Sequence, residues 1–251
     1  AMSHYDFDLF VMGVGSGGVR AARMSAHYGA RVATAEDLYM GGTCVNVGCV
    51  PKKLFVYASH FTEEYEQAQG FGWQKSSPGF DWQVLRDNKD VEIDRLNGVY
   101  RGMLESAEVT HFDGRARIVD AHTISINERR VSTEKILIAT GSWPFIPDFP
   151  GSEYAISSNE VFHLEEFPKR PVVVGGGYIA VEFAGIFKGL GAESHLLYRG
   201  PLFLRKFDDG IRSFVADELD KKGIHLHFNT NVTAIEKNAN DTLKVITAEE
   251  G

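Results

Sequence analysis

The sequence predicts an α/β protein, because the same order of strand, glycine turn, helix and strand occurs twice within its 251 residues. Glycines at 13, 15 and 18 form the first turn, and a similar turn begins at Gly175 and Gly177. A short apolar run precedes each turn, as is typical of a buried parallel strand. Short segments with alternating polarity lie between the two copies. The pattern therefore predicts two Rossmann-like domains with an inserted antiparallel β-meander.

Composition is typical of a globular protein and argues against several functions. Hydrophobic residues make up 43% of the chain and charged residues 24%, which excludes long disorder. The formal net charge of −8 argues against a broad surface for nucleic acids or anionic membranes. No apolar run approaches the roughly 18 residues of a membrane helix, and the first residues lack a signal-peptide pattern. We therefore expect a cytoplasmic protein that binds neither nucleic acids nor membranes.

The first glycine motif predicts a dinucleotide site. The expected elements are a strand at 8–14, a helix at 19–28 and a second strand at 31–36. The glycines permit a tight turn and close approach of the backbone to a pyrophosphate, which the N-terminus of the helix attracts. Glu36 closes the second strand and can accept hydrogen bonds from ribose hydroxyls.

The second motif differs in charge. Its expected elements are a strand at 172–174, a helix at 179–190 and a strand at 193–198. Tyr198 stands where the first copy has Glu36, and Arg199 and Arg205 follow it. A carboxylate would repel a 2′-phosphate, whereas guanidinium groups bind it. The second site therefore suits NADP and the first a dinucleotide without this phosphate, unless the two arginines are solvated loop charges.

The remaining segments predict further helices and strands. Between the motifs we expect a helix at 82–109, strands at 117–119, 123–127 and 130–132, and a buried strand at 135–140. Prolines mark a boundary near 142–151, so the expected domains are 1–145 and 146–251. In the second domain we expect a helix at 208–222 and strands at 224–228, 232–237 and 243–247. The sequence then stops, so we expect this domain to be truncated.

The two cysteines form a C-x4-C pair. Cys44 and Cys49 are too few for a disulfide-stapled scaffold or a structural zinc site, and we expect no metal site. Gly48 could let the chain bend so that the sulfurs meet. The pair then fits a redox couple better than a structural staple. Two unrelated buried thiols are the alternative.

A helix starting near Cys49 would favour a thiolate. Pro51 suits its first turn, because the missing N–H is unbonded there in any helix. The helix dipole and a nearby lysine, Lys52 or Lys53, would both stabilise the negative charge. Otherwise the lysines are two solvated surface charges.

Four motifs in order extend these inferences to a family. They are GSGG at 15–18, GGTCVNVGCVPKK at 41–53, ILIATGSWP at 136–144 and GGGYIAVEFAGIF at 175–187. With them the chain resembles the flavoprotein disulfide reductases, and among these the glutathione reductases. The resemblance implies one FAD-binding and one NADPH-binding domain, reduction of glutathione disulfide through Cys44 and Cys49, and a homodimer as the full-length protein.

The resemblance also implies cofactor contacts. Those implied for FAD are Gly13, Gly15, Ser16, Gly17, Gly18, Glu36, Gly42, Thr43, Thr140 and Gly141. Those implied for NADPH are Gly175, Gly177, Tyr178, Ile179, Arg199 and Arg205. Tyr178 resembles the residue that covers the flavin until the nicotinamide arrives. Its alternative role is that of a packing aromatic on the first helical turn.

The implied catalytic residues are the cysteines and an ion pair. Cys49 would lie against the flavin as the charge-transfer thiolate, and Cys44 would attack the substrate disulfide. Lys52 would lie near the flavin ring, where positive charge stabilises its reduced anion. Glu182 would be the ion-pair partner of Lys52.

Three further residues match the disulfide pocket of the family. Arg20 and Arg23 would attract anionic glutathione disulfide, and Tyr100 would lie near the bound tripeptide. Trypanothione reductases, whose substrate is cationic, place an acid and an aromatic residue there. The alternative is that both arginines are exposed charges on a surface helix.

The sequence also departs from the family. Family members continue beyond this point with segments that complete the FAD site and supply a His–Glu pair for acid–base catalysis. We therefore assign no catalytic histidine to this chain. Trypanothione reductase and lipoamide dehydrogenase remain alternatives, although the latter would place an acid near Tyr198. A noncatalytic nucleotide-binding module is another alternative.

Overall fold

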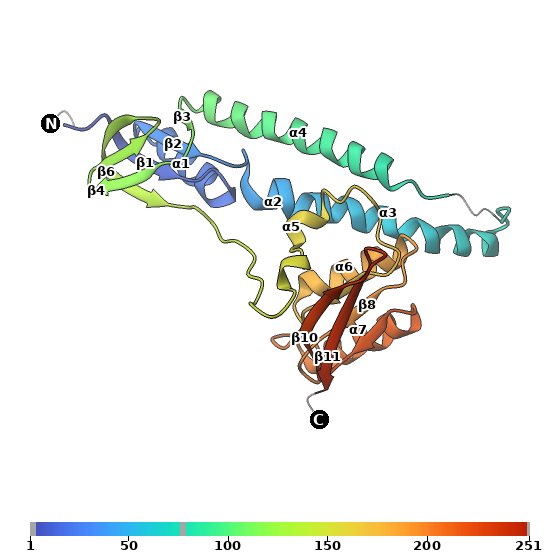
Figure 1. Cartoon of the computed structure of the whole chain (residues 1–251). Coiled ribbons are helices and arrows are strands. Elements are labelled where there is room, and N and C mark those ends of the chain that lie inside the picture. Colours follow the sequence, from blue (N-terminus) through green and yellow to red (C-terminus); the bar gives the residue numbers. More distant parts are fainter. Residues whose placement is uncertain (1–3, 76–78, 250–251) are drawn as a thin grey trace. The chain divides into compact units, whose positions relative to one another are not determined.

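Two compact units make up the chain in this computed structural model, which describes residues 4–75 and 79–249 (Figure 1). The first unit contains the residues up to 52 and residues 87–143, and the second contains residues 53–86 and those from 144 onward. The grouping differs from the expected division after residue 145, because 53–86 joins the second unit. The outer ends of the expected domains, 1–3 and 250–251, lie outside the described residues.

The first unit is built on a six-stranded sheet. Its strands are β1 (Phe7–Met12), β2 (Val32–Glu36), β3 (Thr110–Asp113), β4 (Arg117–Asp120), β5 (Thr123–Ile126) and β6 (Arg129–Ile138). Their order is β3-β2-β1-β6-β5-β4. β1 pairs in parallel with β2 and β6, and β4, β5 and β6 form an antiparallel meander. The predicted α/β class with an inserted meander is confirmed.

The helices that touch this unit are α1 (Ser16–His27), α2 (Gly42–Val47), α3 (Cys49–Ala68) and α4 (Trp82–Ser106). The boundary between the two units falls within α3 and α4. Val19 and Ala22 of α1 are buried in one cluster with Val11 of β1, while the meander packs Ile124 and Ile126 into a separate cluster. Burying a valine or isoleucine side chain contributes about 1.5–3 kcal/mol. The two clusters therefore hold β1 against α1 on one side and against the meander on the other.

The expectation of a buried strand at 135–140 is wrong. Residues 135–138 of this segment are the end of β6, 139 and 140 lie beyond it, and Leu137 and Ile138 are 36% and 64% exposed. The cluster on the meander side is built on β1, β2 and β5 and reaches β6 only at Val131 and Ile136. An apolar run predicts a strand, but the pairing of its neighbours decides how deeply it is buried.

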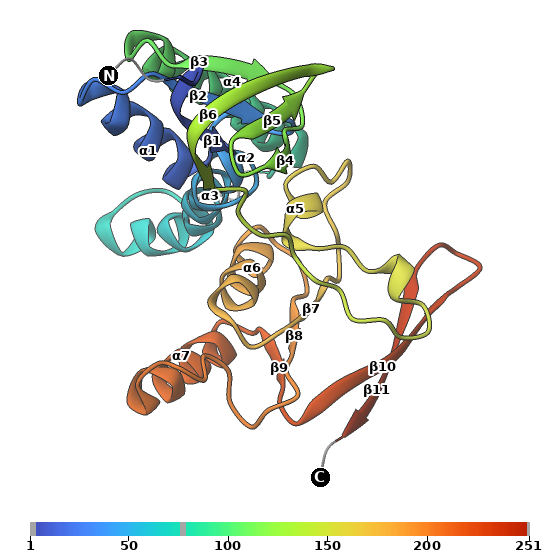
Figure 2. The ribbon, with the colours of Figure 1, turned by 90° about the vertical axis from the view of Figure 1, so that its left-hand side faces the viewer.

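The second unit contains a three-stranded parallel sheet, β7 (Val172–Val174), β8 (His195–Leu197) and β9 (His225–His227). Helices α6 (Tyr178–Gly189) and α7 (Asp209–Lys221) lie on one side of it (Figure 2). A hairpin of β10 (Thr230–Lys237) and β11 (Leu243–Glu249) follows. Short helical turns at Gln69–Phe71, Ser152–Tyr154 and α5 (Ser158–Val161) complete the described elements.

Three features differ from the sequence-based expectations. The strands expected at 130–132 and 135–140 are one continuous strand, β6. The helix expected at 82–109 ends at Ser106 and is followed by β3, which was not expected. The cysteine segment begins with a short helix, α2, where we expected only a bend. Each of these features depends on pairing or packing with distant residues.

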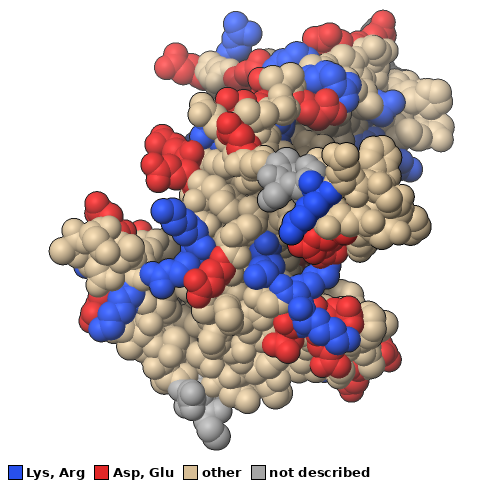
Figure 3. Space-filling view, turned by 90° about the vertical axis from the view of Figure 1, so that its right-hand side faces the viewer, with Lys and Arg blue, Asp and Glu red and all other residues tan. Residues whose placement is uncertain are grey.

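Charge on the surface is mixed. On the face shown in Figure 3, basic and acidic side chains lie next to each other. The described residues include no helix with the length and hydrophobicity of a bilayer-spanning segment.

Two glycines hold the first turn against its neighbours. Gly13 has φ +100°, and a Cβ there would lie 2.3 Å from the carbonyl oxygen of Ala139. Gly42 has φ +67°, and its Cβ would lie 2.5 Å from Cα of Gly15. A side chain at either position would therefore combine backbone strain with a clash against backbone. The second contact brings the start of α2 directly onto the glycine turn.

We predict that Gly42→Ala lowers the free energy of unfolding by about 1–3 kcal/mol, because alanine is strained at positive φ and meets Gly15. Gly98→Ala is the matched control. Gly98 lies in α4, and no atom of the described residues falls within 4 Å of its Cβ position. There alanine should stabilise the helix by about 0.5–1 kcal/mol. Urea unfolding followed by circular dichroism measures both, and an unchanged midpoint for Gly42→Ala contradicts the prediction.

Candidate functional site

The turn between β1 and α1 leaves the N-terminus of a helix accessible. Gly15 is the N-cap of α1 and makes no side-chain cap hydrogen bond. Ser16 and Gly17 are exposed, and within the described part of the chain no heavy atom lies within 4 Å of a Cβ built on Gly17. The N–H groups of the first turn of α1 therefore have no capping side chain, and the glycines beside them leave the backbone accessible. Such a helix start suits an anionic group such as a pyrophosphate.

Glu36 is fixed next to this turn. It is the last residue of β2, and its Oε2 accepts a hydrogen bond from the Val14 N–H at 3.1 Å. Its Oε1 accepts from the N–H groups of Asp37 and Leu38 at 3.1 and 3.0 Å. A carboxylate has about four acceptor positions, so it can still accept hydrogen bonds from hydroxyl groups. The structure therefore brings the predicted ribose acceptor to the predicted pyrophosphate turn.

Other residues predicted at this site lie around the same turn. Thr140 and Gly141 lie just beyond the end of β6, after Ala139, and the Cα of Thr140 lies 3.2 Å from a Cβ built on Gly13. Thr43 is an exposed residue of α2, next to Gly42, which contacts Gly15. Gly18 packs against the carbonyl of Gly13.

The two cysteines meet where α2 ends and α3 begins. Cys44 is partly buried in α2, and Cys49 is exposed as the first residue of α3. Their side chains are close enough for Cys49 to act on the pKa of the Cys44 thiol. Burial raises the pKa of the Cys44 thiol, the Cys49 side chain raises it further, and the positive charge of Lys52 opposes both effects. The thiols are thus direct neighbours with a lysine nearby.

Two asparagines, of which Asn46 is buried and Asn97 partly buried, hold α2 in place. Asn46, which is 8% exposed, donates from Nδ2 to the carbonyl oxygens of Met40 and Gly42 at 3.0 and 2.9 Å. Asn97 of α4 donates to the carbonyl oxygen of Met40 at 2.7 Å and to Oδ1 of Asn46 at 3.0 Å. Sequence reasoning missed both residues. An amide between two valines in the cysteine motif is the one local signal for Asn46.

The residues predicted to bind substrate separate in the structure. Arg20 and Arg23 are exposed on α1, and a guanidinium nitrogen of Arg23 lies 3.6 Å from the sulfur of Met103. Arg23 also lines a surface hollow with Val99 and other residues of α4. The Tyr100 ring instead packs against Gly41 and the cluster around α1. The structure therefore brings Arg23, but not the Tyr100 ring, to that hollow.

The second glycine turn repeats the first in the other unit. Gly175 has φ +148°, and Gly177 is the N-cap of α6 without a capping side chain. Tyr178 and Ile179 begin α6 and are 56% and 40% exposed. The helix N-terminus and these side chains are accessible within this unit.

Arg199 and Arg205 are exposed in the loop that follows β8. Arg212 of α7 supports this loop, because its Nε donates to the carbonyl oxygen of Phe203 and its Nη2 to that of Leu202, both at 2.8 Å. The N–H of Leu204 also bonds the carbonyl oxygen of Gly176 at 2.7 Å. Sequence reasoning missed Arg212, and its position in an ordinary amphipathic helix gave no signal.

The predicted ion pair between Lys52 and Glu182 stays a prediction. Lys52 belongs to the first unit, and Glu182 lies on α6 in the second. Glu182 lines a hollow between α3, α6 and α7 within its own unit.

Comparison with protein families gives one match across nearly the whole chain. The model of the family described as pyridine nucleotide-disulphide oxidoreductase matches residues 7–251. A glutathione reductase of Burkholderia cepacia is 50% identical over 236 residues, which cover 94% of this chain and 53% of that protein. A chloroplastic/mitochondrial glutathione reductase of Pisum sativum is 47% identical and covers 98% of this chain and 47% of its own length. The chain thus spans about half the length of these curated relatives.

Solved structures show the same fold. The HOCl-induced flavoprotein disulfide reductase RclA from Escherichia coli is 28% identical, with a TM-score of 0.82. The similarity covers 96% of this chain and 53% of that protein. Its Cu(II) complex gives a TM-score of 0.82 at 27% identity, with 95% and 52% covered.

We predict that Lys52→Met raises the pKa of the Cys44 thiol, because it removes the positive charge that lowers this pKa. The measurement is the rate of iodoacetamide alkylation against pH, in a Cys49→Ser background so that one thiol reacts. The control is Lys53→Met, since the Lys53 ammonium lies over the Tyr57 ring at 5.6 Å from its centroid. An unshifted pH midpoint in Lys52→Met, or an equal shift in Lys53→Met, contradicts the prediction.

Proposed function

Because this chain belongs to the pyridine nucleotide-disulphide oxidoreductase family, we propose that the protein reduces glutathione disulfide with electrons from NADPH. The observation that carries the proposal is the pair of neighbouring free thiols, Cys44 and Cys49, beside the first glycine turn. The contact of Gly42 with Gly15 joins the cysteine segment to that turn. Relatives named glutathione reductase, 46–50% identical over most of the chain, support the choice of substrate.

The residues around the first turn fit FAD. The uncapped start of α1 and the bare backbone at Gly15, Ser16, Gly17 and Gly18 would hold its pyrophosphate, and Glu36 would accept from its ribose. Gly42, Thr43, Thr140 and Gly141 would line the same cradle. FAD, when bound, would supply two-electron transfer between the nicotinamide and the cysteine pair.

The cysteines perform the exchange. The Cys44 thiolate attacks one sulfur of glutathione disulfide, forms a mixed disulfide and releases one glutathione thiolate. The Cys49 thiolate then attacks Cys44, releases the second glutathione and leaves a Cys44–Cys49 disulfide. Two electrons from NADPH reduce this disulfide to complete the cycle, and the two glutathione thiolates are protonated. We assign the protonation to no histidine of this chain.

Lys52 would support both halves of the reaction. Its charge lowers the pKa of Cys44, which raises the fraction of the nucleophilic thiolate. Near a reduced flavin the same charge would stabilise the anion. Glu182 would be its ion-pair partner.

NADPH would bind at the second turn. The start of α6 at Gly175 and Gly177 would hold the pyrophosphate, and Tyr178 and Ile179 would meet the nicotinamide. Arg199 and Arg205 would bind the 2′-phosphate, because they are exposed on a loop that Arg212 keeps in shape.

Arg20 and Arg23 would select the anionic glutathione disulfide by charge, with Tyr100 near the bound peptide. The proposal includes a homodimer and a cytoplasmic location.

The test is NADPH oxidation by the full-length protein with glutathione disulfide. We expect turnover with this substrate, slower turnover with NADH, and little with trypanothione disulfide or lipoamide. Cys44→Ser and Cys49→Ser should each abolish it, because either change prevents the internal disulfide. Retained turnover in either variant, or equal rates with all disulfides, contradicts the proposal.

We further predict that Arg199→Ala with Arg205→Ala raises the KM for NADPH about tenfold or more, since a hydrogen bond to a charged group contributes about 1.5–3 kcal/mol. The KM for NADH should not change, because NADH has no 2′-phosphate. Arg170→Ala, at an exposed arginine outside this loop, is the control. Equal effects on both nucleotides would mean that the arginines do not recognise the phosphate.

A further inference from the structure

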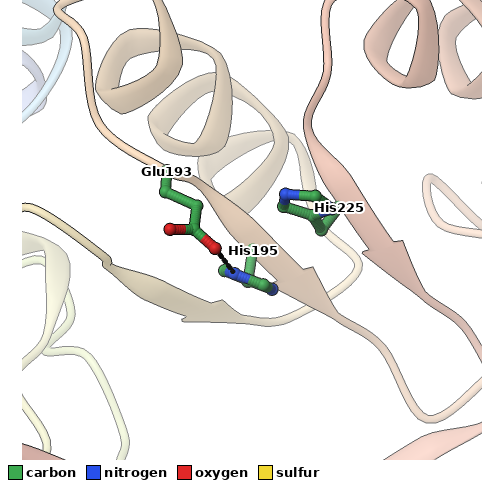
Figure 4. A group of neighbouring side chains, drawn as sticks. All are labelled: Glu193, His195 and His225. Carbon is green, nitrogen blue, oxygen red and sulfur yellow. Dashed lines mark hydrogen bonds and ion pairs between the residues drawn. The ribbon is translucent and has the colours of Figure 1, made fainter.

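Three histidines and a glutamate gather on one face of the β7-β8-β9 sheet. Glu193 lies two residues before β8, His195 begins β8, and His225 and His227 come from β9. Pairing of the strands places His195 directly beside His225. Figure 4 shows Glu193, His195 and His225 together. Among residues 4–75 and 79–249 these three form the one group of three or more histidine, cysteine or acidic side chains with ligand atoms close enough for a metal ion.

Residue alternation along the strands creates this face. Leu196 is buried in the cluster that also contains Ala184 of α6, and Leu226 packs against the same cluster. Neighbouring residues in a strand point to opposite faces, so His195, His225 and His227 project from the face opposite the helices. His225 is exposed, and the His195 side chain is 25% exposed. An ion from solvent can therefore reach these side chains.

The spacing of the polar atoms matches a metal site. His195 Nε2 lies 3.4 Å from Glu193 Oε1. Two ligand atoms bound to zinc at about 2.1 Å, at a tetrahedral angle, are about 3.4 Å apart. The ligand atoms of Glu193, His195 and His225 all lie within 4.8 Å of one another. Rotation of the exposed side chains of Glu193 and His225 can close this spacing without moving the sheet.

The second nitrogen of His195 is already oriented. Its Nδ1 lies 3.1 Å from Nε2 of His227, so one of the two neutral rings donates to the other. When His195 donates, its Nε2 carries a lone pair that faces the Glu193 carboxylate, and a cation bound between these two acceptors would satisfy both.

We propose that Glu193, His195 and His225 bind a divalent transition-metal ion, with His227 holding the His195 ring in its ligating tautomer. Two imidazoles and a carboxylate are borderline ligands that suit Zn²⁺ or Cu²⁺ rather than Mg²⁺ or Ca²⁺. Three protein ligands leave a fourth position open to water. A hydrogen bond from a ligating histidine to a neighbouring acceptor is the usual means of fixing such a ring.

The ion would add metal bonds between two strands that backbone hydrogen bonds and the contact of His195 with His227 already join. Glu193 lies two residues before β8, His195 is the first residue of β8, and His225 belongs to β9, which pairs with β8. Binding to the folded chain stabilises it by mass action, so the ion should raise the thermal midpoint of the protein. This site is separate from the cysteine pair and does not depend on the proposed reductase activity.

The test is zinc titration of the tag-free chain by isothermal calorimetry. Cys44→Ser with Cys49→Ser is the background, because thiolates would otherwise compete for the ion. We expect one Zn²⁺ per chain and a higher thermal midpoint. His225→Gln and Glu193→Gln, each in this background, should weaken binding about tenfold or more, since even loss of an outer partner of a ligand typically costs 10–100-fold.

His60→Gln is the matched control, because His60 is an exposed histidine on α3. The His60→Gln variant should bind Zn²⁺ with the same affinity as the Cys44→Ser, Cys49→Ser background. With Cu²⁺ as probe, electron paramagnetic resonance should show coupling to two imidazole nitrogens, and to one in His225→Gln. Circular dichroism checks that each variant is folded. Absence of stoichiometric binding, or equal affinities in background and His225→Gln, overturns the proposal.

Discussion

The contact between Gly42 and Gly15 is the constraint on which the first site depends. With no side chain on either residue, the start of α2 reaches the turn before α1, and a Cβ on Gly42 would lie 2.5 Å from Cα of Gly15. The N–H of Gly41 adds a hydrogen bond to the carbonyl oxygen of Val14 at 3.1 Å. Because Cys44 follows two residues later in the same helix, this backbone contact sets where the thiols lie relative to the glycine turn.

The asparagine network makes that contact rigid. Asn46 and Asn97 satisfy the carbonyl oxygens of Met40 and Gly42 where the chain enters α2, a place where α2 has no capping side chain. A buried carbonyl without a donor would cost about 1–3 kcal/mol, so the network favours one conformation of the segment. Lys52 then lies on the first turn of the next helix, where its charge reaches Cys44. Polar packing, rather than the cysteines themselves, positions the sulfur pair.

Sequence patterns predict those parts of this structure that depend on residues close together in the chain. Both βαβ turns were predictable, because glycine spacing and apolar runs report the bends and strands directly. Three features were not. The continuous β6 depends on pairing with β5 and β1 at once, and β3 depends on pairing with β2. Asn97 joins the cysteine segment only because α4 packs beside it. The exposure of Ile138 likewise depends on what its neighbours cover.

The same reasoning explains why one fold can carry different charge chemistry in its two units. Both turns present an uncapped helix start after a parallel strand. In the first unit, the next strand ends in Glu36, whose carboxylate is held by three backbone N–H groups. In the second, Tyr198 occupies this place, and its ring packs against Gly176 and Gly200. With no acid at this position, the exposed cations of the following loop, Arg199, Arg205 and Lys206, have no neighbouring carboxylate at the end of the strand.

The histidine cluster extends this argument to the outer face of the second sheet. We expected no metal site from the sequence, because there are only two cysteines and the nearest further thiol or imidazole along the chain is His60. Only the register of β8 and β9 brings His195 beside His225. The inward residues of these strands are fixed by the core, since Leu196 is fully buried. The outward positions carry no such packing requirement, so they are free to hold polar ligands without loss of the fold.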